Sequence, residues 1–192
     1  VNEKYLFKFF SFFLLVINIR AEEVILEIES HWNEINSMSG RFIQTDSDEN
    51  ILEGNFYFLK PYQSKFDYDN GNETVITNKS LLRIVDKEGY QINSYAIGNN
   101  IIKKLLSNEF KLIEEFNIID IVTLKKNYKL MMTFKNDDLE NKFLLYFNRD
   151  SFDLEKWEIY DEFDNKTVLE FTNIKKNIFI SQNLFAVKYK NK

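Results

Sequence analysis

Apolar and polar residues alternate in short runs from Gly40 almost to the end of the chain. Before Gly40 the apolar residues recur at steps of three and four, and after it they recur at every second position, between breaks of Asn, Asp, Gly or Lys. A period of two is typical of strands with one buried face. Because the breaks are too short for the crossover connections of parallel strands, the chain predicts a mainly β protein with helices (α+β) and an antiparallel sheet.

We expect about eleven strands, following one another as a meander. Residues 69–72 (Asp-Asn-Gly-Asn) and 161–166 have the composition of hairpin turns. The expected strands lie near 41–46, 51–60, 64–69, 73–77, 81–86, 90–95, 118–126, 128–135, 142–148, 154–160 and 167–174.

Several of these strands are apolar on both faces. Phe56 and Phe58 point to one side of their strand while Tyr57 points to the other, and residues 143–147 are all apolar or aromatic. A strand of this kind must be covered on both faces. A curved sheet with helices on its concave side meets that requirement.

Two amphipathic helices are expected to provide the cover. The first spans residues 22–38 and is closed by Gly40. The second is short and is capped by Asn99 and Asn100. The apolar face of the first is Ile25, Ile28, Trp32 and Ile35, and that of the second is Ile101, Ile102, Leu105 and Leu106.

Residues 1–21 read as a cleavable secretion signal. Lys4 and Lys8 precede an apolar run that begins at Phe9 and ends at Ile17, and Ala21 is an acceptable residue for cleavage. The alternative is a retained membrane anchor, but the run is about nine residues long against the roughly 20 that span a bilayer. We therefore expect an exported protein with one domain, residues 22–192.

Composition excludes several classes of protein. The chain has no cysteine, so it can form no disulfide, thiolate metal site or catalytic thiol, and it cannot carry a lipid on an N-terminal cysteine. Residues 1–21 hold three basic side chains and one acidic one, which leaves residues 22–192 with a net charge of −7, against −5 for the whole chain. That charge argues against nucleic acid or an anionic lipid surface as the partner.

Catalysis has little support. His31 is the only histidine and is expected to be a solvated neighbour of Trp32. The paired carboxylates are adjacent in sequence, a spacing that places neighbours on opposite faces of a strand and suits acid–base work poorly; they are Glu114 with Glu115, Asp137 with Asp138, and Asp161 with Glu162. No nucleophile elbow, phosphate loop or metal-ligand cluster is present in the sequence, so we expect no enzyme, cofactor or metal.

A series of short motifs resembles the periplasmic outer-membrane lipoprotein carrier family, LolA. They are SGRFIQ at 39–44, Glu53-Gly54, Lys60-Pro61, KFDY at 65–68, then Leu154, Trp157, Asp161 and Thr167 at family spacing, and a terminal segment over 173–185. Each is weak alone, but their order covers almost the whole chain after residue 21.

The resemblance implies an incomplete antiparallel barrel with an α-helical lid over an apolar cavity. It also implies a monomeric periplasmic carrier that takes the acyl chains of lipoproteins from an inner-membrane ABC transporter to an outer-membrane acceptor, LolB. LolB shares this fold but needs an N-terminal cysteine, which the chain lacks. Two alternatives stay open: a periplasmic binder of another lipid or apolar ligand on the same half-barrel, and an adaptor without a cavity.

The chain departs from the family at two positions. Asn78-Lys79-Ser80 replaces the expected Asp-Gly-Lys turn, and Lys60 stands where the family has the Arg that latches the lid. Lysine lacks the planar fork of arginine, so a latch here should be weaker or differently shaped. The alternative for Lys60 is an ordinary solvated charge.

The acyl-chain cavity is expected to be lined by large apolar side chains, with the second helix as its lid. The alternative is that these side chains form closed core. The candidate lining is Phe42, Phe56, Phe58, Phe66, Leu82, Ile84, Met132 and Phe134.

Overall fold

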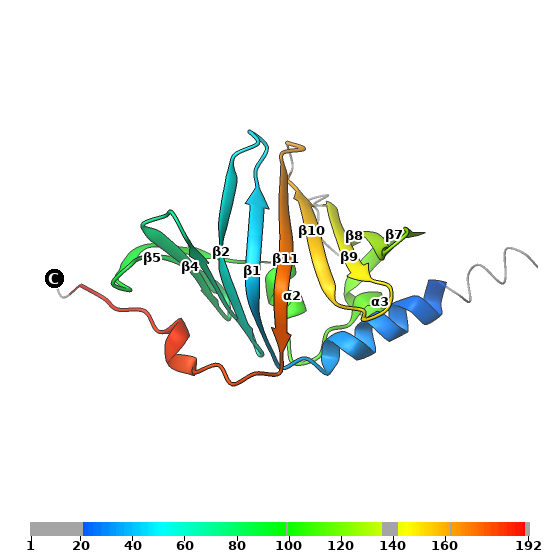
Figure 1. Ribbon diagram of the computed structural model, residues 1–192, viewed down its shortest axis with the longest axis horizontal. Helices are drawn as coiled ribbons and strands as arrows, with labels where there is room; N and C mark the ends of the chain where they lie inside the picture. The colour runs from blue at the N-terminus through cyan, green and yellow to red at the C-terminus, as the bar shows by residue number, and fades with distance from the viewer. Residues whose placement is uncertain (1–20, 99, 136–141, 162, 191–192) are drawn as a thin grey trace, which may run out of the picture.

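Eleven antiparallel strands form one strongly curved, open sheet in the computed structural model, which describes residues 21–98, 100–135, 142–161 and 163–190 (Figure 1). The sheet confirms the expected fold class and strand number. Residues 1–20 of the expected signal segment, together with Asn99, Asp137, Asp138 and Glu162, lie outside the described residues. The strands are β1 (Ser37–Thr45), β2 (Ile51–Leu59), β3 (Gln63–Tyr68), β4 (Glu73–Asn78), β5 (Leu81–Asp86), β6 (Gln91–Ala96), β7 (Phe116–Thr123), β8 (Asn127–Phe134), β9 (Lys142–Asn148), β10 (Leu154–Tyr160) and β11 (Lys166–Lys176).

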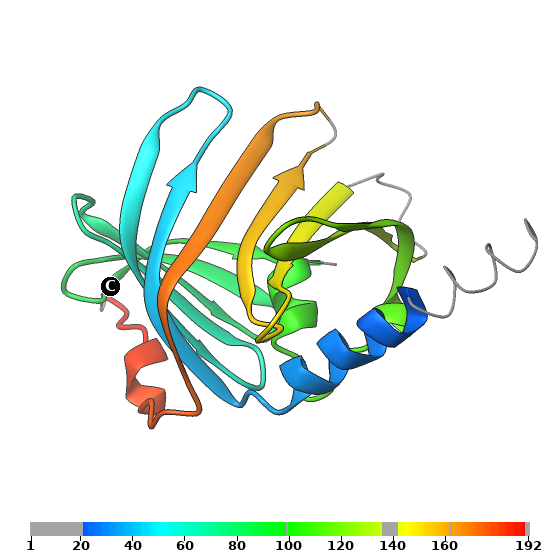
Figure 2. The same ribbon diagram turned by 45° about the vertical axis from the view of Figure 1, so that its right-hand side comes forward.

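The strand order makes two meanders rather than the single one expected. It runs β6-β5-β4-β3-β2-β1-β11-β10-β9-β8-β7, so the first and last strands pair in the middle of the sheet. Consecutive β6 and β7 therefore form opposite edges. The chain passes between them through α2 (Ile101–Leu105) and α3 (Leu112–Glu115), which lie on the concave side (Figure 2).

The N-terminal helix is shorter than expected, with its helical residues at 21–33. Ser37 already belongs to β1, where the segment after β11 holds it: Ser37 Oγ donates to the carbonyl oxygen of Ile178 at 2.6 Å. Gly40 lies inside β1 and does not close the helix. A Cβ at Gly40 would come within 2.6 Å of the carbonyl oxygen of Thr172, so this glycine permits the close approach of β11.

The main core fills the concave side of the sheet. The four apolar residues predicted for the first helix, Ile25, Ile28, Trp32 and Ile35, are all buried there, with inward-facing side chains of eight strands and with α2 and α3. The sheet faces and the helix therefore meet along the apolar surfaces that the periodicity predicted.

A second, smaller core covers the opposite face of β4 and β5. The 3-10 helix η1 (Gln182–Phe185) places Phe185 against Ile76 and Val85. The chain beyond β11 runs beneath the sheet to reach this position, as Figure 2 shows in red. The sequence predicts helices on the concave side only, so this cover of the opposite face is a feature that was not predicted.

Candidate functional site

Six of the eight candidate lining residues meet in the main core: Phe42, Phe56, Phe58, Phe66, Met132 and Phe134 are each at most 5% exposed. Leu82 and Ile84 are half-buried and lie outside that cluster. They still share its face, because Ile84 pairs with Val75, which pairs with Phe66, and paired residues point to the same side of a sheet. The candidates thus mark one concave surface: the six on β1, β2, β3 and β8 form closed core, and the two on β5 lie where the cover is incomplete.

The expected lid residues cover this surface. Ile101 and Leu105 are 1% exposed and Leu106 is 2% exposed, while Ile102 is partly buried against the same core. The predicted cap is present, since the side chain of Asn100 accepts a hydrogen bond from the backbone N–H of Ile102 at 2.8 Å.

The lid is larger than α2 alone. Asn33 on the N-terminal helix exchanges two hydrogen bonds with the backbone of Phe110, and Glu29 accepts from the backbone N–H of Leu112 at 2.7 Å. Lys104 of α2 and Glu115 of α3 form an ion pair at 2.9 Å. We define the N-terminal helix and residues 100–115 together as the lid. No local sequence pattern signalled the contacts that join its parts.

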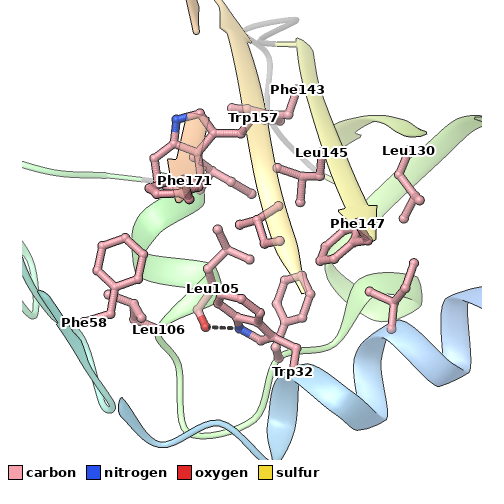
Figure 3. Packing of buried hydrophobic residues seen from close by; sticks show 14 of the residues in the cluster. Trp32, Phe58, Leu105, Leu106, Leu130, Phe143, Leu145, Phe147, Trp157 and Phe171 are labelled. Atoms are coloured by element: carbon pink, nitrogen blue, oxygen red, sulfur yellow. Dashed lines mark hydrogen bonds between the residues drawn. The ribbon is translucent and has the colours of Figure 1, made fainter. Parts of the chain in front are cut away.

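A chain of polar contacts joins the lid to the end of β2. Lys60 Nζ donates to the carbonyl oxygen of Trp32 at 2.8 Å, and the indole Nε1 of Trp32 donates to the carbonyl oxygen of Leu105 at 2.7 Å (Figure 3). The backbone N–H of Tyr62 donates to the carbonyl oxygen of Leu106 at 2.6 Å. We call this set, Lys60, Trp32, Leu105, Leu106 and Tyr62, the lid latch.

Lys60 sits at the rim of the core. Its ammonium lies 5.7 Å from the ring centroid of Trp32, and burial lowers the pKa of its side chain to about 8. A cavity of about 10 Å³ adjoins it, lined in part by Trp32, Phe58 and Leu106. The sheet and the lid are therefore closed on one another at the latch.

Two buried tryptophans differ in how their indole N–H groups are satisfied. Trp32 and Trp157 are each 1% exposed, and the N–H of Trp32 has the carbonyl of Leu105 as its acceptor. The Nε1 of Trp157 has no hydrogen-bond partner among the described residues. Leaving such a donor buried without an acceptor costs about 1–3 kcal/mol.

A second polar cluster holds the N-terminal helix to the sheet. His31 Nε2 lies 3.0 Å from Asp153 Oδ1, and Lys176 Nζ lies 2.7 Å from the same oxygen. Burial alone would raise the pKa of Asp153, but hydrogen bonds from Lys176, His31 and Ser151 bring it below its ordinary value. His31 is therefore a hydrogen-bond partner of Asp153 in a half-buried cluster and not the solvated neighbour that was expected.

A surface hollow of about 740 Å³ opens between the start of the N-terminal helix and the edge formed by β7 and β8. Its apolar wall includes Val24, Ile121, Tyr128 and Phe152, all of which pack against the main core. This volume is within the range of small-molecule sites in proteins. The hollow extends the apolar interior towards solvent at one edge of the sheet.

Few side chains in the described ranges are arranged for catalysis or for metal binding. Within the described ranges, no group of three or more His, Cys, Asp and Glu side chains is arranged to hold a metal ion. Ser151 Oγ donates to Asp153 and not to His31, so these three residues do not form a nucleophile with its base. Across the same ranges, every helix is too short or too polar to cross a bilayer.

The fold and the site define a class: an open antiparallel half-barrel whose concave, aromatic surface is covered by a helical lid. The chain belongs to the LolA family, whose model, described as outer membrane lipoprotein carrier protein LolA, matches residues 33–188.

Individual relatives are distant. Outer-membrane lipoprotein carrier proteins from two subspecies of Francisella tularensis, tularensis and holarctica, are each 26% identical to the chain, over 92% of it and 89% of their own length. An uncharacterized conserved protein from Thermus thermophilus has a similar fold, with a TM-score of 0.52 and 9% identity over 88% of this chain and 99% of that one. The structure of a LolA superfamily protein from Nitrosomonas europaea aligns with 84% of this chain and with 96% of its own length, with 10% identity and a TM-score of 0.45.

Proposed function

We propose that this protein is a periplasmic carrier that shelters the acyl chains of outer-membrane lipoproteins between its lid and the concave face of its sheet. The observation that carries the proposal is the lid latch. The apolar surfaces of the lid and of the sheet are held together at their rim by the hydrogen bonds from Lys60 to Trp32 and from Tyr62 to Leu106, while the bond from Trp32 to Leu105 joins the two parts of the lid. When these bonds release, both surfaces become available to hydrocarbon.

The physical need for such a device is large. Each exposed CH₂ of an acyl chain costs about 0.8 kcal/mol in water, so one long chain costs on the order of 10 kcal/mol. A carrier must also release its cargo. The closed lid meets this need, because the lid's burial of its own residues, such as Ile101 and Leu105, competes with cargo for the same surface.

The family and the names of the relatives support lipoproteins as the cargo. We further propose that the single domain, which begins at Glu22, receives lipoproteins from an inner-membrane ABC transporter and delivers them to LolB or an equivalent acceptor. It acts as a monomer, without catalysis and without a cofactor. Lys60 is the proposed residue of the lid latch that controls opening. The proposed lining consists of Phe42, Phe56, Phe58, Phe66, Leu82, Ile84, Met132 and Phe134.

Depletion of the protein in its source cell tests this role. We expect lipoproteins to accumulate in the inner membrane, as measured by fractionation. Normal sorting would exclude the protein as the main carrier. Organic-solvent extraction of the purified protein, followed by mass spectrometry, distinguishes a lipoprotein carrier from a binder of another apolar ligand. Lipoprotein cargo supports the carrier, and a free lipid alone supports the other binder.

A further inference from the structure

Trp157 is a buried residue whose indole N–H has no hydrogen-bond acceptor among the described residues in the closed state. It lies on β10 with its indole inside the main core, stacked on Phe58 at a centroid distance of 6.4 Å. Phe171 meets it edge to face at 4.9 Å. A ring face is a much weaker acceptor than a carbonyl oxygen. The indole N–H therefore has aromatic neighbours but no acceptor of ordinary strength among the described residues.

Other buried polar side chains of the concave face and the lid have at least one partner among the described residues. Ser64 and Thr77 are 2.6 Å apart and bond to one another, and Trp32 donates to Leu105. Glu115, which has one unpaired buried oxygen, uses its other oxygen to bind Lys104. Trp157 differs because its only polar atom is the unpaired one, and that atom can only donate.

The position of Trp157 connects it to the lid. Phe58, on which it stacks, also lines the cavity at the latch with Lys60 and Leu106. Figure 3 shows Phe58 beside Leu106, with Trp157 further along the same concave surface. A ligand that enters by displacing α2 from Phe58 therefore reaches the indole next.

We propose that Trp157 Nε1 is a recognition point for the carbonyl oxygen of an ester- or amide-linked acyl chain. This inference rests on the proposed function. Along an acyl chain the CH₂ groups accept no hydrogen bond, and the carbonyl at its head is the polar atom that enters with the hydrocarbon. Bound there, the carbonyl would fix how deep each chain lies and would distinguish acyl lipids from plain hydrocarbon.

A matched pair of ligands tests the proposal: a 1-monoacylglycerol and the 1-O-alkylglycerol of the same chain length, in which a CH₂ replaces the carbonyl. Trp32 and Trp157 are the only tryptophans in the chain, so a ¹⁵N-labelled sample gives two indole N–H signals. The spectrum of Trp157→Phe assigns them. We expect the ester to bind about tenfold more tightly than the ether, equal to about 1.4 kcal/mol, and to move the Trp157 signal downfield where the ether does not. Trp157→Phe should bind both equally.

Two results would overturn the proposal. The first leaves the proposed carrier function intact, and the second contradicts that function as well. If ester and ether bind equally and the Trp157 signal responds alike to both, the recognition point is wrong while the carrier stands. If neither ligand binds, and a triacylated lipopeptide does not bind either, the proposed function fails and this inference fails with it.

Discussion

Lys60 and Trp32 meet at the rim of the lid, where the ammonium of Lys60 donates a 2.8 Å hydrogen bond to the carbonyl oxygen of Trp32. The same tryptophan uses its indole to bind Leu105 of α2. Trp32, on the N-terminal helix, thus links the residue that follows β2 to α2. Loss of either bond should loosen the lid without removing a strand from the sheet.

Lys60→Ala should impair cargo loading or release and leave the fold intact. The substitution removes the donor that holds Trp32, so we expect a lower rate of lipoprotein transfer in a reconstituted assay, with an unchanged circular dichroism spectrum. Lys175→Ala is the matched control, since Lys175 is an exposed lysine of β11. Wild-type transfer by Lys60→Ala would identify Lys60 as a solvated charge.

The affinity for acylated cargo should fall as the pH rises from 8 to 10.5. Burial lowers the pKa of Lys60 to about 8 in the closed state, whereas water restores it towards 10.5 once the lid opens. The open state therefore binds the proton more tightly, and raising the pH through this window favours the closed state, by at most about tenfold for each pH unit. The dissociation constant of a triacylated lipopeptide, measured from pH 7 to 10, checks this.

Lys60→Met supplies the control for this pH dependence. The variant keeps most of the apolar stem but has no group that titrates at this position, so its curve should be flat across the window. An equal fall in affinity in the variant would place the titrating group elsewhere.

Trp32→Phe should destabilise the protein more than Trp157→Phe does. Both substitutions replace a fully buried indole with a smaller ring, but only the first breaks a hydrogen bond and leaves the carbonyl of Leu105 without its donor. We expect the free energies of unfolding in urea to differ by about 1–3 kcal/mol. Equal losses in the two variants would show that the Trp32 bond adds nothing to stability.

Asp153→Asn should lower the free energy of unfolding at pH 7 by about 1–2 kcal/mol. The carboxylate of Asp153 accepts contacts from both His31 and Lys176. Because the cluster is only half-buried, water weakens each of these interactions and keeps the expected loss small. Because the pKa of Asp153 is lowered on folding, its contribution is present above the ordinary pKa of aspartate and is lost as the pH falls through the folded value.

Urea unfolding at pH 7 and at pH 3 separates this effect from a change of shape. The difference between wild type and Asp153→Asn should shrink at the lower pH. Asp150→Asn in the same turn, where Asp150 is exposed, should have little effect at either pH. A difference of constant size at both pH values would contradict the role of the charge.

Local patterns in the sequence predicted much of the fold. Alternation located the strands because most of them bury one face, and the spacing of Ile25, Ile28 and Trp32 located the buried face of the first helix. Asn100 was found as a cap because capping is a contact between neighbours in the chain. Gly40 misled the prediction because a glycine after a helix and a glycine at a close strand contact look alike in sequence.

Contacts between distant parts of the chain could not be found in this way. The pairing of β1 with β11, the bond from Lys60 to Trp32 and the cluster of His31 with Asp153 each join residues that no periodicity relates. The cover of β4 and β5 by Phe185 is of the same kind. The sequence alone therefore identified the apolar surfaces that meet beneath the helices but not the bonds that hold them together.

In the proposed function, the lid opens to admit acyl chains to the concave face. Binding of a triacylated lipopeptide, with the same peptide unacylated as control, tests it most directly when backbone and side-chain NMR signals are followed. We expect saturable binding of the acylated peptide alone, with the largest changes at α2 and at Phe56, Phe58 and Met132 on the sheet. Absence of binding, or binding that leaves these interior signals unchanged, would contradict the account.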